Sequence, residues 1–248
     1  MLPDAFWLGG GGGAGKTTAA RRIAFARDLR LYCVDHYGYD HQRRAAPGSR
    51  TAAFEAMTYD ERWHRDPAGL AGDFVAISRE RFDLMLADLD ALGPGPAVIV
   101  EGPQLLPDLV APLLPSPAYA CWLLPAPDVA AAGVESRDEA VPPGRVARDR
   151  LLVELIRRDA AALGLRTVAD RNVLVPPDLR GAVDGAQRRR IRAAENAVAL
   201  AQLRAYAADA DLAEPPVHTF SCECERLGCG RDVLLTADAY ERSGADAH

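Results

Sequence analysis

The N-terminal segment from Gly10 to Thr18 holds the residues whose types and spacing are most specific for chemistry. Gly10, Gly15, Lys16 and Thr17 match the pattern G-x-x-x-x-G-K-[ST]. In such a loop the glycines let backbone N–H groups surround phosphate oxygens, the lysine reaches the β- and γ-phosphates, and the threonine hydroxyl coordinates Mg²⁺. The segment predicts a nucleoside triphosphate site, for ATP or GTP, formed by Gly10, Gly11, Gly12, Gly13, Ala14, Gly15, Lys16, Thr17 and Thr18.

Lys16 is the only lysine in the chain, because Arg supplies the other 28 of its 29 basic residues. Arg presents a planar fork of donors, whereas Lys is a compact point charge. A sequence that otherwise uses Arg throughout therefore has a specific need for Lys at this position. A glycine-rich turn that binds nothing is the alternative interpretation, and the solitary lysine argues against it.

The C-terminal tail holds a second group of residues with ligand chemistry. His218, Cys222, Cys224 and Cys229 form the pattern H-x3-C-x-C-x4-C. Thiolates and imidazole are the usual ligands of tetrahedral Zn²⁺, and thiols this close together rarely form structural disulfides in a reducing compartment. The pattern predicts a zinc site with His218 as its fourth ligand, and three thiols without a metal are the alternative. Residues 220–241 also resemble a small cysteine motif that ends many actinobacterial proteins.

The composition is that of a globular protein with a sizeable core. Apolar residues make up 49% of the chain and charged residues 26%, which excludes a disordered protein. The net charge of −6 argues against binding to nucleic acid, because neutralising phosphates requires a basic surface. No apolar stretch is long enough for a membrane span, and the N-terminus lacks a signal-peptide pattern. We therefore expect a cytoplasmic protein with neither a membrane nor a nucleic acid as partner.

Short apolar runs that alternate with helical patterns must position these residues. Strands are predicted at 4–9, 29–34, 97–100, 119–124 and either 165–169 or 173–175. Helices are predicted at 16–29, 67–92, 151–163 and 179–212. Residues 36–50 predict a polar loop, residues 137–150 a flap interrupted by prolines, and residues 233–240 an extended run followed by a helical turn. Strands this apolar indicate a parallel sheet that helices cover on both faces.

Residues 4–180 resemble the P-loop small-molecule kinases, the group that includes shikimate kinase, chloramphenicol phosphotransferase, uridine kinase and the nucleoside monophosphate kinases. Besides the phosphate loop, the resemblance lies in Asp35, directly after the second apolar run, and in Glu101, at the end of the third. It implies that Asp35 accepts the proton of the acceptor hydroxyl and that Glu101 lies beside the phosphates and Mg²⁺. An aspartate that caps a turn and a structural glutamate are the alternatives.

The flap at 137–150 resembles the lid that closes over ATP in nucleotide kinases. Its residues Arg145 and Arg148, preceded by Arg137, would neutralise charge on the transferred phosphoryl group. A solvated charged surface is the alternative. In these kinases the loop after the second strand folds over the acceptor, which implies acceptor-binding roles for His36, Tyr37, Tyr39 and Arg44.

The predicted fold is a three-layer α/β P-loop NTPase fold with a five-stranded parallel sheet, in the order 2-3-1-4-5 that the resemblance implies. We expect a kinase-like domain at 1–213 and a cysteine-containing tail at 214–248. The predicted activity is transfer of the γ-phosphate of ATP, with Mg²⁺, to a hydroxyl of a small molecule. The alternatives are an ATP- or GTP-hydrolysing regulatory or adapter protein whose tail binds a partner, and a nucleic-acid kinase that uses the arginines of 188–192.

Overall fold

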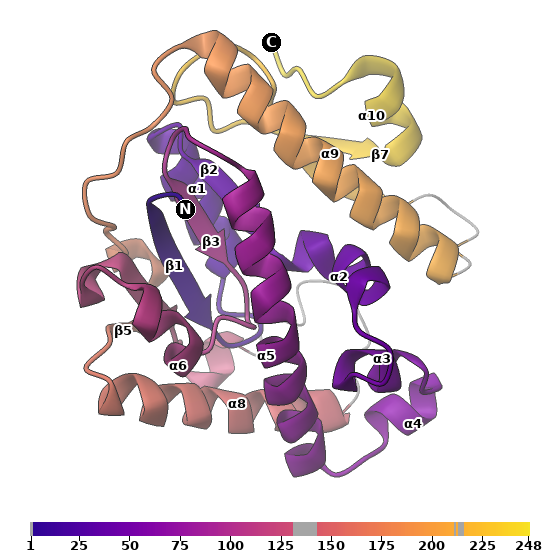
Figure 1. Cartoon of the computed structure of the whole chain (residues 1–248). Coiled ribbons are helices and arrows are strands. Elements are labelled where there is room, and N and C mark those ends of the chain that lie inside the picture. Colours follow the sequence, from indigo (N-terminus) through magenta and orange to yellow (C-terminus); the bar gives the residue numbers. More distant parts are fainter. Residues whose placement is uncertain (1, 131–142, 211, 213–215) are drawn as a thin grey trace.

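The computed structural model describes residues 2–130, 143–210, 212 and 216–248 (Figure 1). Its strands are β1 (Ala5–Gly10), β2 (Arg30–Cys33), β3 (Val98–Glu101), β4 (Ala120–Leu123), β5 (Thr167–Val168), β6 (Val217–Ser221) and β7 (Asp232–Thr236). Its α-helices are α1 (Lys16–Ala26), α2 (Gly38–Arg44), α3 (Arg50–Glu55), α4 (Tyr59–Trp63), α5 (Pro67–Ala91), α6 (Pro107–Val110), α8 (Pro143–Ala162), α9 (Gly185–Asp209) and α10 (Ala237–Ser243). Short 3-10 helices are η1 (Val34–Tyr37), η2 (Ala111–Leu113), η3 (Pro117–Tyr119) and η4 (Arg171–Val173).

The first five strands form one parallel sheet in the order β2-β3-β1-β4-β5. This confirms the predicted α/β fold and strand order. Of the two segments offered for the last strand, the structure selects 165–169, which contains β5. The carboxyl ends of β1, β2 and β3 meet at one edge of the sheet, so the phosphate loop, Asp35 and Glu101 are brought to the same place.

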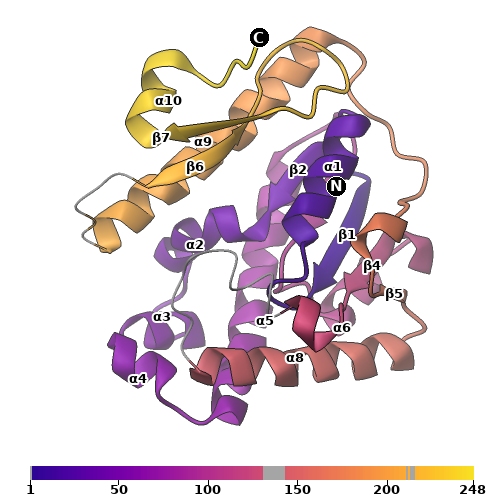
Figure 2. The same cartoon turned by 180° about the vertical axis from the view of Figure 1, so that it is seen from behind.

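Each face of the sheet has its own apolar core. Side chains alternate along a strand, so Phe6 and Leu8 of β1 face α1 while Trp7 faces the opposite side. That opposite side is covered by α5, α6 and α8, as the two views in Figures 1 and 2 show. Because both faces are covered, the central strands are apolar throughout, as the sequence predicted.

Helix α9 protects the outer edge of the sheet. Edge strands expose unpaired backbone groups, and here Glu195 Oε1 accepts the N–H of Leu31 on β2 at 2.7 Å. The C-terminal tail packs along α9 and also reaches α1, where Arg21 pairs with Asp232, and within the tail β6 and β7 pair antiparallel (Figure 2). Phe220 on β6 packs with Ala199 and Leu203 of α9, so the tail shares its small core with that helix. The predicted domain boundary at 213/214 falls outside the described residues.

Two predicted irregular segments are helical, and those predictions were wrong. The expected loop after β2 forms η1 and α2, because α9 supports it: Gln202 Oε1 accepts the backbone N–H of Tyr39 at 3.0 Å. The helix expected from 151 begins at Pro143, since proline is compatible with the first turn of a helix. Residues 137–142 of the expected flap lie outside the described part. No helix in the described ranges combines the length and apolar character that a bilayer span requires.

Candidate functional site

The phosphate loop is folded for anion binding by its glycines. Gly15 has φ of 81°, a left-handed conformation that costs glycine little, and a Cβ there would lie 2.8 Å from Arg171 Nη1. α1 begins at the next residue, so its first backbone N–H groups point toward the loop. Lys16 is buried, and its Nζ donates to Gly11 O at 2.7 Å, which keeps the ammonium inside the loop. These features form a cradle for phosphate groups.

Two hard oxygen ligands lie together beside this cradle. The Thr17 hydroxyl donates to Glu101 Oε1 at 2.9 Å, because Glu101 ends β3 next to β1. Hydroxyl and carboxylate oxygens are the ligands that Mg²⁺ takes in nucleotide sites, often with water between the carboxylate and the ion. The residues present therefore fit a magnesium ion, which Thr17 and Glu101 would hold when a nucleotide is bound.

Glu101 is almost fully buried, and its environment favours the neutral acid. Burial raises the pKa of Glu101, the nearby charge of Asp35 raises it further, and Lys16 and the Thr17 hydroxyl lower it only in part. A buried carboxyl whose ionisation is opposed by a second carboxylate is suited to a cation that neutralises both. Mg²⁺ bound with a nucleotide would supply that charge.

Glu101→Gln should reduce the pH dependence of stability. With a pKa above the unfolded value of 4.5, Glu101 binds its proton more tightly in the folded state, so its contribution is full below pH 4.5 and is lost as pH rises through the folded pKa. We therefore expect that, without Mg²⁺, the free energy of unfolding measured in urea decreases more between pH 5 and pH 8 for the wild type than for Glu101→Gln. Parallel pH profiles for the two proteins would contradict this account of Glu101.

The loop faces a cavity of about 340 Å³. It is lined by Gly10, Gly11, Gly12, Gly13, Lys16, Thr17, Asp35, Trp63, Phe74, Pro103, Gln104, Arg145, Arg148, Asp149, Leu152 and Ile156. The structure thus brings the predicted residues Lys16, Asp35, Arg145 and Arg148 to one cavity. Glu101 lies behind it, hydrogen-bonded to Thr17.

The two arginines belong to the first turns of α8, and aromatic rings of α4 and α5 hold them. Arg148 lies over the rings of Trp63 and Phe74, with centroid distances of 5.4 Å and 5.3 Å, and also pairs with Asp149 at 2.6 Å. Arg145 lies over Trp63 at 5.9 Å. Stacking on aromatic faces orients a guanidinium, and the Nε and Nη2 donors of Arg148 bond Asp149, so an incoming anion would compete with Asp149 or bind the remaining N–H groups.

The four residues predicted to bind the acceptor do not line this cavity. Tyr37 stacks on Tyr32, and the Tyr39 hydroxyl donates to Asp209 at 2.9 Å. Arg44 donates to Asp88 at 2.6 Å, while the His36 ring lies against His218. The cause is the helical conformation of this segment: η1, which carries His36 and Tyr37, packs on α9, and α2, which carries Tyr39 and Arg44, packs on both α9 and α5.

Four further lining residues of the cavity were not predicted from the sequence: Trp63, Phe74, Gln104 and Asp149. Trp63 and Phe74 flank the N-terminus of α5, and Gln104 follows the Glu101-Gly102 corner. Asp149 is so close to the loop that a Cβ on Gly12 would lie 2.9 Å from its Oδ2. Gln104 could have been predicted, because it follows the predicted site residue Glu101 by only three positions. Nothing in the sequence near Trp63 or Phe74 indicates that they line a cavity.

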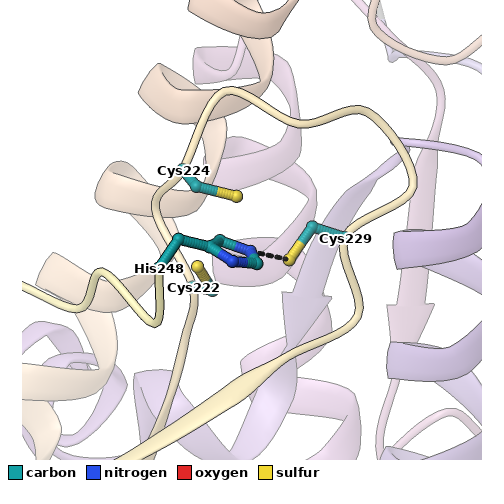
Figure 3. Close-up of side chains that lie close together, drawn as sticks. All are labelled: Cys222, Cys224, Cys229 and His248. Atoms are coloured by element: carbon teal, nitrogen blue, oxygen red, sulfur yellow. Dashed lines mark hydrogen bonds between the residues drawn. The ribbon is translucent and has the colours of Figure 1, made fainter.

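The structure changes which residues of the tail could bind a metal ion together. Cys222, Cys224, Cys229 and His248 form a group whose ligand atoms all lie within 4.8 Å of one another (Figure 3). His218 is not in this group, so its prediction as fourth ligand was wrong. It lies on β6, where the strand pairing with β7 turns its ring toward His36 and Phe220 rather than toward the cysteines.

The arginines of 188–192 do not form one exposed basic face. Arg188 and Arg192 are buried, and Arg192 donates to the carbonyl of Leu29 at 2.8 Å. Arg189 and Arg190 are exposed. Because two of the arginines face inward, the cluster offers less contact surface to a nucleic acid than the sequence suggested.

No protein-family model matches this chain, and a comparison with curated proteins finds no similar sequence. Among solved structures, shikimate kinase from Acinetobacter baumannii in complex with shikimate is similar over 68% of this chain and 84% of that chain, with 14% identity and a TM-score of 0.37. A likeness of this degree carries no argument about activity. The fold is therefore assigned from the sheet topology, and the site is interpreted from its own geometry.

Proposed function

We propose that the chain is an ATP-dependent kinase that transfers the γ-phosphate to a hydroxyl of a small molecule, with Mg²⁺. The observation that carries the proposal is the single cavity shared by the phosphate loop, Asp35 and the arginines of α8. Its volume of about 340 Å³ is within the range for small-ligand sites, and it includes the space beside the loop that the phosphates would occupy. The aromatic and amide side chains in the lining favour an organic acceptor over a water molecule alone.

Each residue has a defined role in this proposal. Lys16 and the backbone of the loop bind and orient the phosphates, and Thr17 and Glu101 hold Mg²⁺, which neutralises phosphate charge when bound. Asp35 accepts the proton of the acceptor hydroxyl at its carboxylate. Arg145 and Arg148 stabilise the negative charge on the transferred group. Trp63, Phe74 and Gln104 offer the acceptor an aromatic surface and a polar amide.

The proposal is tested by measuring ADP release from ATP and Mg²⁺ with pools of nucleosides, sugars, hydroxy acids and hydroxyl-bearing antibiotics. Release that depends on one pool, together with a product heavier by one phosphoryl group, is the expected result. Lys16→Ala should lack both signals. ADP release that is indifferent to every pool would overturn the proposal in favour of a hydrolysing regulatory protein.

Arg148→Ala should lower kcat by about 100-fold or more, because it removes a cation aimed at charge that develops in the transition state. The KM for ATP should change much less. Arg150→Ala is the matched control: Arg150 lies on the same helix, is exposed and does not line the cavity, so kcat should stay within about twofold. If kcat fell equally in Arg148→Ala and Arg150→Ala, Arg148 would have no specific role in phosphoryl transfer.

A further inference from the structure

Three thiols and one imidazole converge where the tail meets α9 (Figure 3). Cys222 directly follows β6, Cys224 and Cys229 lie in the loop that leads to β7, and His248 follows α10. The Cys229 Sγ is 3.5 Å from His248 Nε2, and all four ligand atoms lie within 4.8 Å of one another. A tetrahedral Zn²⁺ with bonds of about 2.3 Å needs ligand atoms roughly 3.8 Å apart, so small side-chain rotations would close the site.

The backbone around the cysteines is held by a buried cation. Arg188 is 1% exposed, and its guanidinium donates to the carbonyl oxygens of Cys222 at 3.1 Å, of Cys229 at 2.7 Å and of Cys224. Its Nε donates to Asp28 at 3.1 Å, and Asp28 also accepts the N–H of Gly228 at 2.8 Å. Metal sites are commonly fixed by such an outer layer of hydrogen bonds.

Two sulfur atoms also accept hydrogen bonds from nitrogen. The backbone N–H of Ala247 donates to Cys222 Sγ at 3.4 Å, and Arg188 Nη1 donates to Cys224 Sγ at 3.7 Å. Hydrogen bonds to the ligand atoms themselves belong to the same outer layer that orients the ligands of a metal site. The positive charge of Arg188 also offsets the excess negative charge that three thiolates leave on a divalent ion.

We propose that Cys222, Cys224, Cys229 and His248 bind one Zn²⁺ ion. Three thiolates and a neutral imidazole match the soft ligand set of a closed structural zinc site. His248 would bind through Nε2 and carry its proton on Nδ1. The exposed Arg226 side chain, whose Nη1 is 3.2 Å from Nδ1, then turns toward solvent. A disulfide would use two of the three thiols and would leave His248 without a role.

The ion would join the two ends of the tail, because all four ligands lie within it, and Arg188 of α9 would hold this cross-linked segment against the body of the protein. The small core around Phe220 is the only apolar cluster that the described tail residues share with α9, and a short segment of this kind gains stability from a metal. Gly228 and Gly230, on either side of Cys229, line a second cavity of about 560 Å³ that extends to Thr17 and Thr18 of α1. The zinc site thereby fixes one wall of that cavity. This proposal does not depend on the kinase proposal.

The test compares His248→Ala with His218→Ala in the full chain, purified under reducing conditions. The readouts are zinc per chain by elemental analysis, competition with a chromophoric chelator, and the thiolate-to-metal absorption of the Co²⁺ form. The wild type and His218→Ala should hold one zinc per chain. Loss of an outer-layer partner costs about 10–100-fold in metal affinity, so loss of the His248 ligand should cost roughly 100-fold or more. His248→Cys should restore tight binding.

His248 is exposed, so its replacement should leave the fold intact, and circular dichroism can verify this. The proposal is overturned if the wild type holds no zinc. It is also overturned if His218→Ala loses zinc while His248→Ala retains it, or if both variants bind zinc as tightly as the wild type.

Discussion

Lys16→Ala should lower kcat/KM for ATP by about 100-fold or more, equivalent to ~2.7 kcal/mol of transition-state stabilisation. The ammonium is the one lysine charge in the chain, and it lies inside the phosphate loop, donating to Gly11 O at 2.7 Å. Without it, the negative charge on the β- and γ-phosphates is no longer neutralised from this side. Steady-state kinetics of ADP release and calorimetric titration of ATP with Mg²⁺ measure the effect.

Two further variants separate charge from geometry. Lys16→Arg keeps the charge but replaces a compact ammonium with a planar fork in a narrow loop, so it should remain severely impaired. Arg43→Ala removes one positive charge from an exposed position on α2 and should leave ATP binding unchanged. Wild-type ATP affinity in Lys16→Ala would show that the glycine loop is not the nucleotide site.

Asp35→Asn should lower kcat by about 100- to 10,000-fold, with little change in the KM for ATP. Asn is close to Asp in size but cannot accept the proton of the acceptor hydroxyl. Asp35 follows β2 on η1, is exposed, and lines the cavity together with Lys16 and Thr17. Pre-steady-state measurement of ADP formation, with the acceptor found in the pool screen, isolates the transfer step.

The matched control is Asp40→Asn. Asp40 lies five residues further along on α2, pairs with Arg44 at 2.7 Å and is absent from the cavity lining. Its replacement should leave kcat within about twofold of the wild type. If Asp35→Asn keeps more than about a tenth of the wild-type kcat, Asp35 is not the base. The aspartate would then have a structural role beside Glu101.

Much of the phosphate side of the site could be predicted because its determinants are local. The loop from Gly10 to Thr18 is one continuous segment between a strand and a helix, and its pattern specifies its own conformation. Asp35 and Glu101 were found for a related reason: each follows a short apolar strand, and parallel strands bring their carboxyl ends to one edge. The helix predicted from residue 67 begins there as α5, and its start is local too: the Asp66 side chain accepts the N–H of Gly69 at 2.8 Å.

The acceptor side could not be predicted, because side-chain direction there depends on distant contacts. His36, Tyr37, Tyr39 and Arg44 look exposed and polar in sequence. In the structure η1 and α2, which carry them, pack against α9, more than 150 residues further along the chain. Trp63 and Phe74 look like ordinary apolar positions, yet they hold the arginines of α8 over the cavity. No periodicity in either segment encodes a partner so far along the chain.

The sequence alone predicted the phosphate loop and the grouping of the three cysteines, because each depends on residues close together in the chain. It also predicted the parallel sheet, because apolar runs recur along the chain. Tertiary structure decided which side chains complete each site. It brought Trp63, Phe74 and Gln104 to the same cavity as the phosphate loop. It also brought His248 to the cysteines in place of His218, although His248 follows Cys229 by 19 residues. The physical reason is the same in both cases. Packing between elements that are far apart in the sequence decides which side chains become neighbours, and spacing along the chain does not encode that packing.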